Sequence, residues 1–377
     1  MLKILFVVRG FFPDLSASGN LIYPLVKEMI ELAEVDILTF SNDCKTESID
    51  SISVTRIKNN ESNLVKLFNL FKRHFSYPYY NSTLTKKIRT EVELLDKKNS
   101  YDVIIAVTHE EIIALTEANV PTEKKGCFLL EKLHETSKFS VVKQKQRQAN
   151  SQIYSKICHE LKFKFALPKV VDYLLMESQK NVFEIEHPMV INNIRESRVD
   201  LDEILLVYIG GLDLYQRNPW PIIDFFQSID LNIRFDMYGY GNVFSKKSIL
   251  PSKSSYKGVI NKCDINERLD EASFLISIGN KENDIFPSKI FDCLSTGIPI
   301  IHFSQTLDDP YYEYLDGYDN AIIINISQLH LIEERQRIIN FIIKNVGNRE
   351  SYETISDKFY KQTPSYNCEK ILSFING

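Results

Sequence analysis

The chain has 377 residues, of which 44% are apolar and 25% are charged, and its formal net charge is −5. This composition is ordinary for a soluble globular protein, and the length exceeds what one compact core holds, so we expect two domains. No apolar run approaches the length of a membrane span, and the strand-like run at 3–8 is too short for a signal peptide. The six cysteines are far apart and form no CxxC pair, which indicates neither a zinc ribbon nor a disulfide framework. We therefore expect a reduced, cytosolic protein.

Strand and helix patterns alternate along the first half of the chain. Strands are predicted at 2–8, 35–40, 101–107, 126–130 and 171–176, and helices at 16–32, 62–74, 82–98 and 110–118, with a basic helical region before the last strand. Alternation of this kind favours a parallel, doubly wound sheet.

A second alternating series begins near residue 203, after a polar, linker-like segment. Strands are predicted at 204–209, 233–238, 256–260, 273–279, 299–303 and 321–326, and helices at 220–229, 264–272, 327–346 and from 351 onward. The expected fold class is α/β, with one Rossmann-like domain at 1–195 and another at 203–354. A C-terminal helix at about 355–377 is expected to pack back on the first domain.

The segment 286–303, FPSKIFDCLSTGIPIIHF, predicts a short helix, a tight turn and a buried strand. Ser288 suits the cap or the first turn of the helix, and Gly297 suits its end. The start of this helix, from Phe286 to Lys289, would present backbone N–H groups that suit an anion.

Ligands of open α/β sheets bind at the carboxyl ends of the strands, so the loops there are candidate site segments. Gly210–Gly211 follows the first strand of the second series and permits close approach of a ligand to the backbone. Arg217 can bind two phosphate oxygens, although alone it also fits a surface turn. Gly239–Gly241 lacks a third glycine and is a weak dinucleotide signal. Val259 lies at another strand end, where backbone groups could contact a base.

Two carboxylates flank the start of the short helix. Asp284 lies in the loop before it, and Asp292 lies about one turn into it. The Asp292 carboxylate can accept two hydrogen bonds from a ribose diol. Taken alone, Asp292 also fits a solvated or capping role.

Basic residues gather at 138–169, where eight lysines and arginines face one acid, Glu160. The run is either a solvated helix face or a surface for anionic lipid or an acidic substrate. Leu64, Phe68 and Phe71 recur at helical spacing and fit either the core face of a helix or a membrane contact.

Together these residues resemble the donor domain of GT-B glycosyltransferases, in particular the large retaining family 4 group and its subset with a Pro-Ser-Lys start. The matching pattern is Asp284, seven residues and Asp292, followed by the turn at 296–299. The resemblance covers most of the chain, extends to 11–19, 186–188 and 210–219, and is specific at 279–303. It implies a GT-B fold, in which an N-terminal acceptor-binding domain and a C-terminal donor-binding domain, both Rossmann-like and doubly wound, face a central cleft.

Carried over by position, the resemblance implies roles for single residues. Asp292 would bind ribose, Asp284 would lie near the donor sugar, and Arg217 would bind the diphosphate. The family often has an arginine where this chain has Gly211, and Lys289 is the candidate for the compensating charge. The expected catalytic residues are His109, which directly follows the strand at 101–107, Asp284, Arg217 and Lys289. The expected donor-binding residues are Gly19, Gly211, Arg217, Gly239, Val259, Phe286, Ser288, Lys289 and Asp292.

The implied reaction moves a sugar from a nucleotide diphosphate sugar, expected to be UDP-linked, to a hydroxyl of a glycan or lipid-linked acceptor. We expect retention at the anomeric carbon and a role in surface polysaccharide or glycoconjugate synthesis. No metal or other cofactor is expected, because cationic side chains and a helix N-terminus would stabilise the leaving group. The expected partners are the donor, the acceptor and the anionic inner face of a membrane, and no nucleic acid.

Two alternatives stay open. A non-catalytic sugar-nucleotide-binding partner of another transferase fits the replacement of both family glutamates by shorter aspartates and the glycine at 211. A GT-B sugar-nucleotide epimerase would have the same two domains and would release free UDP without an acceptor.

Overall fold

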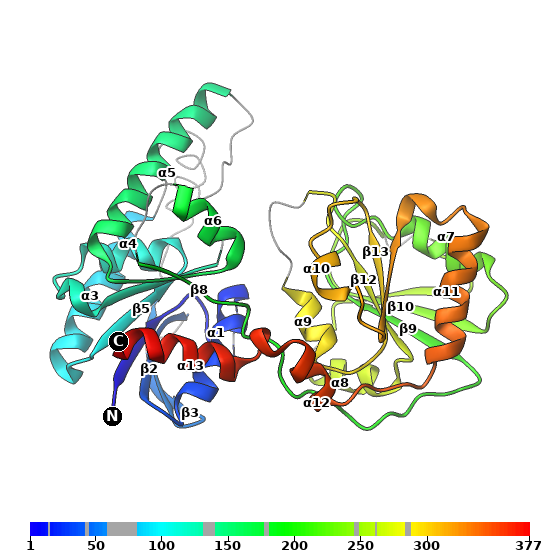
Figure 1. Ribbon diagram of the computed structural model, residues 1–377, viewed down its shortest axis with the longest axis horizontal. Helices are drawn as coiled ribbons and strands as arrows, with labels where there is room; N and C mark the ends of the chain where they lie inside the picture. The colour runs from blue at the N-terminus through cyan, green and yellow to red at the C-terminus, as the bar shows by residue number, and fades with distance from the viewer. Residues whose placement is uncertain are drawn as a thin grey trace. The chain divides into compact units, whose positions relative to one another are not determined.

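A computed structural model of the protein describes residues 1–13, 16–41, 45–58, 81–130, 140–176, 181–244, 249–260, 262–282 and 288–377. The chain forms two compact units (Figure 1). Unit 1 comprises Met1–Met189 and Lys361–Gly377, and unit 2 comprises Val190–Tyr360. Asp284, Phe286 and the predicted helix at 62–74, with its apolar residues, lie outside the described residues.

The sheet of unit 1 has the strand order β3-β4-β2-β1-β5-β6-β7-β8. Its strands are β1 (Lys3–Val7), β2 (Glu34–Ser41), β3 (Lys45–Ile49), β4 (Ile52–Lys58), β5 (Val103–Val107), β6 (Lys125–Leu129), β7 (Phe163–Ala166) and β8 (Val182–Glu184). Among the described pairings only β3 with β4 is antiparallel. Apart from Lys3, the central strands β1 and β5 are apolar and buried, as expected where a parallel sheet is covered on both faces.

The helices of unit 1 are α1 (Ala17–Met29), α3 (Ser82–Asn99), α4 (His109–Glu117), α5 (Ser140–Glu160), α6 (Pro168–Met176) and α13 (Pro364–Asn376). α13 comes from the end of the chain and packs against α1. Phe374 of α13 stacks on Phe183, with ring centroids 4.0 Å apart, and Cys368 and Ile371 are buried. The last helix therefore completes the core of the unit that contains the N-terminus (Figure 1).

The predicted strand at 171–176 is wrong, because these residues belong to helix α6. Pro168 suits the first position of a helix, and the buried residues Val170, Val171 and Leu174 recur at helical spacing. The prediction also missed β3, β4, β7 and β8. β4 does alternate between buried and more exposed residues over most of its length, which is a strand signal.

Unit 2 has a parallel sheet with the strand order β11-β10-β9-β12-β13-β14. The strands are β9 (Ile204–Ile209), β10 (Ile233–Tyr238), β11 (Ser254–Gly258), β12 (Phe274–Ile278), β13 (Ile300–Ser304) and β14 (Ala321–Asn325). The helices are α7 (Trp220–Ser228), α8 (Lys262–Glu271), α9 (Lys289–Leu294), α10 (Tyr312–Leu315), α11 (Ile332–Asn345) and α12 (Tyr352–Lys358). α7 and α11 share one apolar cluster with the strands, and α8 belongs to another.

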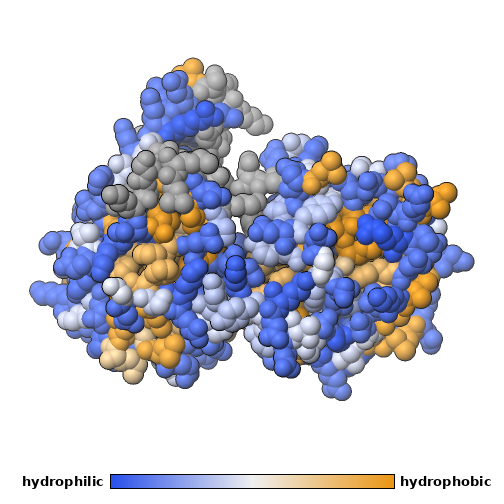
Figure 2. Space-filling view, in the orientation of Figure 1, coloured by the Kyte–Doolittle hydropathy of each residue, from blue (hydrophilic) through white to orange (hydrophobic). Residues whose placement is uncertain are grey.

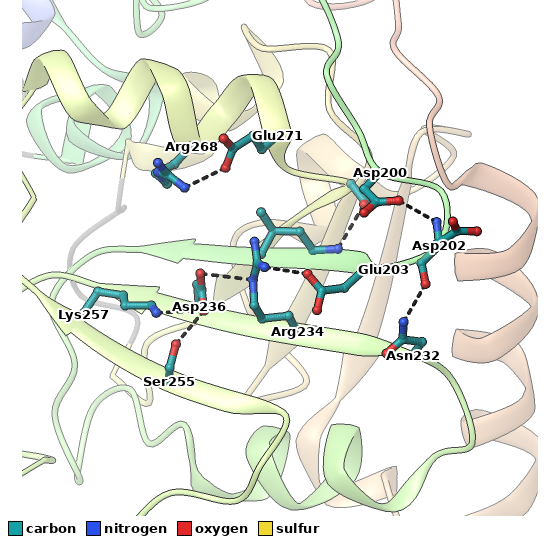
Figure 3. Close-up of polar contacts among 12 residues, drawn as sticks. Asp200, Asp202, Glu203, Asn232, Arg234, Asp236, Ser255, Lys257, Arg268 and Glu271 are labelled. Atoms are coloured by element: carbon teal, nitrogen blue, oxygen red, sulfur yellow. Dashed lines mark hydrogen bonds and ion pairs between the residues drawn. The ribbon is translucent and has the colours of Figure 1, made fainter.

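Strand β10 shows how sequence sets the two faces of this sheet. Ile233, Phe235 and Met237 point into the larger apolar cluster. Arg234 and Asp236 alternate with them and join a polar network on the other face (Figure 3). The Asp236 carboxylate accepts a hydrogen bond from Ser255 at 2.5 Å and lies 3.5 Å from Arg234 Nε, so these charges pair with each other.

No helix among the described residues is long and apolar enough to cross a membrane. Hydrophilic residues cover most of the visible surface of each unit, with apolar residues in patches between them (Figure 2).

Candidate functional site

In the sheets that the structure describes, each unit has a point at which the strand order reverses. In unit 2 the chain moves outward from β9 through β10 to β11, then returns to the other side of β9 with β12. In unit 1 the reversal lies between β1 and β5. Crevices at such points bind the ligands of open α/β sheets. The candidate site segments are therefore the loops after β9 and β12 in unit 2 and after β1 and β5 in unit 1.

The loops after β9 and β10 run alongside each other beyond the ends of their strands. The Gly210 N–H donates to the Tyr238 carbonyl at 2.8 Å, and the Leu212 N–H donates to the Tyr240 carbonyl at 3.0 Å. Gly239 and Gly241 have φ of +142° and +156°, and a Cβ on either would overlap the backbone of the neighbouring loop. Only glycine suits both the positive φ and the close approach of the two backbones, so the Gly239–Gly241 motif supports this close packing.

A tight turn fixes the backbone before Arg217. The Asp213 carboxylate accepts the N–H groups of Tyr215 at 2.8 Å and Gln216 at 2.9 Å, which holds the pKa of this carboxyl below its usual value. The Arg217 N–H then donates to the Asp213 carbonyl at 2.8 Å. The turn therefore presents Arg217 from a constrained loop.

Arg217 joins the loops after β9 and β12. Its Nε donates to the Asn280 side-chain oxygen at 2.7 Å, and its guanidinium also hydrogen-bonds Tyr208. Gln305, which follows β13, donates from Nε2 to the carbonyls of Gly279, at 2.7 Å, and Gln216. Side-chain hydrogen bonds thus tie three loops together at the carboxyl edge of the sheet.

Lys289, the first residue of α9, reaches the same edge. Its Nζ lies 3.1 Å from where a Cβ on Gly210 would be and 6.0 Å from the centroid of the Tyr208 ring. Burial lowers the pKa of Lys289, Cys293 and Asp292 on the same helix oppose this, and the nearby positive charge of Arg217 adds a small further lowering. Burial also raises the pKa of Tyr208 to about 12, and its hydroxyl donates to the Gly211 carbonyl at 2.8 Å.

The edge of unit 2 therefore carries two neighbouring cations. No carboxylate among the described residues forms an ion pair with Arg217 or Lys289. Two like charges brought close together disfavour each other, and a bound anion would stabilise both. A diphosphate is an anion of suitable charge.

The other predicted donor residues lie at or near this edge. The Tyr240 ring lies 3.2 Å from where a Cβ on Gly211 would be, so the ring covers the position at which an arginine was expected. Val259 follows β11 and is 76% exposed. Ser288 occupies the N-cap position of α9 without a side-chain capping bond, and Asp292 is exposed on the first turn. α9 has only six residues, so the cationic side chains are the main groups for an anion.

The equivalent edge of unit 1 contains His109 and Gly19. His109 is the first residue of α4 and is partly buried. Gly19 is in the first turn of α1, and its N–H donates to Ser16 Oγ at 3.1 Å. Arg9, in the loop after β1, lies 3.4 Å from a Glu110 oxygen and 3.8 Å from a Glu111 oxygen. At this edge of unit 1, therefore, the cation Arg9 lies close to two carboxylates.

Sequence reasoning missed several residues at the two edges. Tyr208 and Asn280 contact Arg217. Arg9 and Glu111 interact across the loops of unit 1. For Tyr208, Asn280 and Arg9, the position at or directly after a predicted strand was an available signal, whereas Glu111 lies inside a predicted helix. Among the described residues, no group of three or more histidines, cysteines or acids is placed to hold a metal ion.

Comparison with solved structures finds proteins of similar architecture. The lipopolysaccharide outer core galactosyltransferase WaaB in its apo form is 11% identical with a TM-score of 0.58, over 100% of this chain and 99% of that one. TarM is 11% identical with a TM-score of 0.71, over 100% and 99% of the two chains. The UDP-forming α,α-trehalose-phosphate synthase from Burkholderia xenovorans, in complex with glucose-6-phosphate, is 11% identical with a TM-score of 0.67, over 100% of both chains.

These likenesses show the fold: the chain has the GT-B fold, with two Rossmann-like units. No model of a known protein family matches the sequence, and no curated protein matches it.

Proposed function

We propose that this protein is a glycosyltransferase that moves a sugar from a nucleotide diphosphate sugar to a hydroxyl of a glycan or lipid-linked acceptor. The observation that carries the proposal is the pair of cations, Arg217 and Lys289, at the reversal point of the unit 2 sheet. The GT-B fold supports it, because structural neighbours with this fold include a galactosyltransferase and a UDP-forming synthase. UDP is therefore the first nucleotide to test.

In this proposal, Arg217 and Lys289 bind the diphosphate of the donor. When the bond between the anomeric carbon and the diphosphate breaks, negative charge develops on the leaving UDP, and the two cations stabilise it. The half-buried position of Lys289 makes each interaction stronger than it would be in water. Asp292 binds the ribose diol, and Asp284 lies near the donor sugar, as the sequence resemblance implies.

Unit 1 then binds the acceptor, with His109 close to the reacting hydroxyl. We propose retention at the anomeric carbon and a product in surface polysaccharide or glycoconjugate synthesis, both on the sequence resemblance. The mechanism needs no divalent metal, because the cations take over the charge stabilisation. Turnover should therefore continue in EDTA, and loss of turnover that Mn²⁺ restores would contradict this part.

The test is a thermal-shift screen over nucleotide sugars, followed by detection of glycosylated product. At a hundredfold excess over Kd, a ligand of the folded state stabilises it by about 2.7 kcal/mol. Stabilisation by a UDP-sugar and by UDP itself, together with acceptor-dependent release of UDP, is expected. Binding without turnover would favour a non-catalytic partner of another transferase, and UDP release without an acceptor would favour an epimerase.

We also propose that α5 contacts an anionic membrane surface that carries the acceptor. Lys143, Lys145 and Arg147 lie on this helix, and its visible side is largely hydrophilic (Figure 2). Each such residue contributes about 1 kcal/mol at an anionic surface, and the attraction fades with salt. Sedimentation with phosphatidylglycerol vesicles at low salt is expected, and changing the three residues to Ser should weaken it.

A further inference from the structure

Thr108, between β5 and α4, has a backbone conformation that threonine rarely adopts. Its φ is +76° and its ψ is 167°. A β-branched residue is strained at positive φ, and such strain persists only where surrounding contacts hold it. The strained residue directly precedes His109, so whatever holds Thr108 also sets the start of α4.

Glu111 is the side chain that holds Thr108. The Thr108 hydroxyl donates to Glu111 Oε2, and the Glu111 side chain is fully buried. The other oxygen, Oε1, has no hydrogen-bond partner among the described residues, and Arg9 Nε lies 3.8 Å from it. A buried carboxylate with one unsatisfied oxygen is costly to keep charged.

The charged groups that act on Glu111 come from two elements. Arg9 is in the loop after β1, and Glu110 is its neighbour on α4. The pKa of Glu111 is raised to about 7, mainly by burial and to a smaller extent by Glu110, while Arg9 and the Thr108 hydroxyl oppose the rise. The Arg9 carbonyl is in turn held by the hydroxyls of Ser16 and Ser18 at the start of α1.

We propose that Glu111 is a positioning residue for transfer: its carboxylate holds Thr108 in the strained conformation and so aims His109 from the carboxyl edge of unit 1. This rests on the proposed function, in which unit 1 binds the acceptor. Protonation of Glu111 removes its ion pair with Arg9 and weakens its bond from Thr108. Transfer should therefore rise with pH through neutrality, as Glu111 ionises.

Stability should change in the opposite direction. The folded protein binds the Glu111 proton more tightly than the unfolded chain, whose carboxyl titrates at its ordinary, lower pKa. Stability should therefore fall as the pH rises from about 4.5 to about 7, where the folded protein holds the Glu111 proton and the unfolded chain has lost it. A group that only supported the structure would not lower stability over the same pH range in which it raises activity.

Three variants test this. Glu111→Gln has nearly the same shape and cannot ionise, so it should lower kcat about tenfold and remove the rise in kcat near pH 7. Thr108→Gly relieves the strain and removes the hydroxyl, so it should melt no lower than wild type yet lose kcat to a similar extent. Thr108→Ser keeps the hydroxyl and should retain kcat within about threefold. KM for the donor should stay within about twofold of wild type in all three.

The melting temperature provides a readout that does not depend on transfer. Between pH 5.5 and pH 8.5, wild type should lose stability relative to Glu111→Gln, and an unchanged difference would show that Glu111 does not titrate there. An unaltered pH profile of kcat in Glu111→Gln would also overturn the proposal. Calorimetry with UDP on wild type tests the proposed function separately, because failure to bind UDP would refute donor binding and leave the melting result valid.

Discussion

The two units place opposite chemistry at the same point of the same fold. At the reversal point of unit 2, Arg217 and Lys289 lie together, and no described carboxylate forms an ion pair with either. At the reversal point of unit 1, Arg9 lies between Glu110 and Glu111. The sheet topology sets where a ligand binds, and the residues of a few loops set which charge is preferred there.

The difference also appears in the pKa shifts of half-buried Lys289 and fully buried Glu111. Burial lowers the pKa of Lys289 in unit 2 and raises that of Glu111 in unit 1, so each site disfavours its own charge before a ligand arrives. A bound anion would relieve the repulsion at the first site. Groups perturbed in this way are common at functional sites.

The largest effect is expected from Arg217→Ala. Loss of a charge-assisted phosphate contact costs about 1.5–3 kcal/mol, so Kd for UDP should rise roughly 10- to 150-fold. Isothermal titration calorimetry measures this Kd. The control is Arg268→Ala, which removes an arginine that pairs with Glu271 on α8. Equal effects of the two substitutions would mean that the unit 2 edge does not bind the diphosphate.

Lys289→Met should weaken UDP binding about tenfold and at the same time raise the melting temperature. The pKa of Lys289 is lower in the folded protein, so the unfolded chain binds the proton more tightly and the charge opposes folding at neutral pH. The control is Lys281→Met, an exposed lysine in the loop after β12 whose ammonium lies 4.7 Å from the Tyr215 ring centroid. A lower melting temperature in Lys289→Met would show that Lys289 supports the fold.

Asp292→Asn should raise Kd for UDP by about three- to tenfold, because the ribose diol loses a charged acceptor. The sharper measurement compares UDP with the analogue that lacks both ribose hydroxyls. The variant should lose most of the preference for the hydroxylated compound. If the preference stays at the wild-type level, another residue binds the ribose.

The smallest effect on the donor is expected from Arg9→Ala. Since Arg9 already pairs with two carboxylates, Kd for UDP should change less than about twofold. Arg9 lowers the pKa of Glu111, so its removal should move the midpoint of the pH dependence of stability upward. A large loss of UDP affinity in Arg9→Ala would show that the unit 1 edge also binds the donor, which contradicts the proposed difference between the two edges.

Local patterns in the sequence predicted much of the fold. The apolar runs at β1, β5, β9, β12 and β13 are strands, and Ile290, Phe291 and Leu294 are the buried side of α9. The turn at Gly297 ends that segment as predicted, with φ of +68°. These features depend on residues close in sequence, where periodicity and turn chemistry act directly. The segment 171–176 misled because an apolar run of that length fits a strand or a buried helix equally.

Only the tertiary structure decided which of the loop residues meet. Arg217 and Asn280 are 63 positions apart, and nothing local requires their hydrogen bond. Lys289 reaches Gly210 because β9 and β12 are neighbours in the sheet, and Arg9 reaches Glu111 because β1 and β5 are. The sequence by itself determined the elements and the residue types at their ends. The strand order then determined the charges and pKa values at each edge, since both depend on distances and burial that only packing creates.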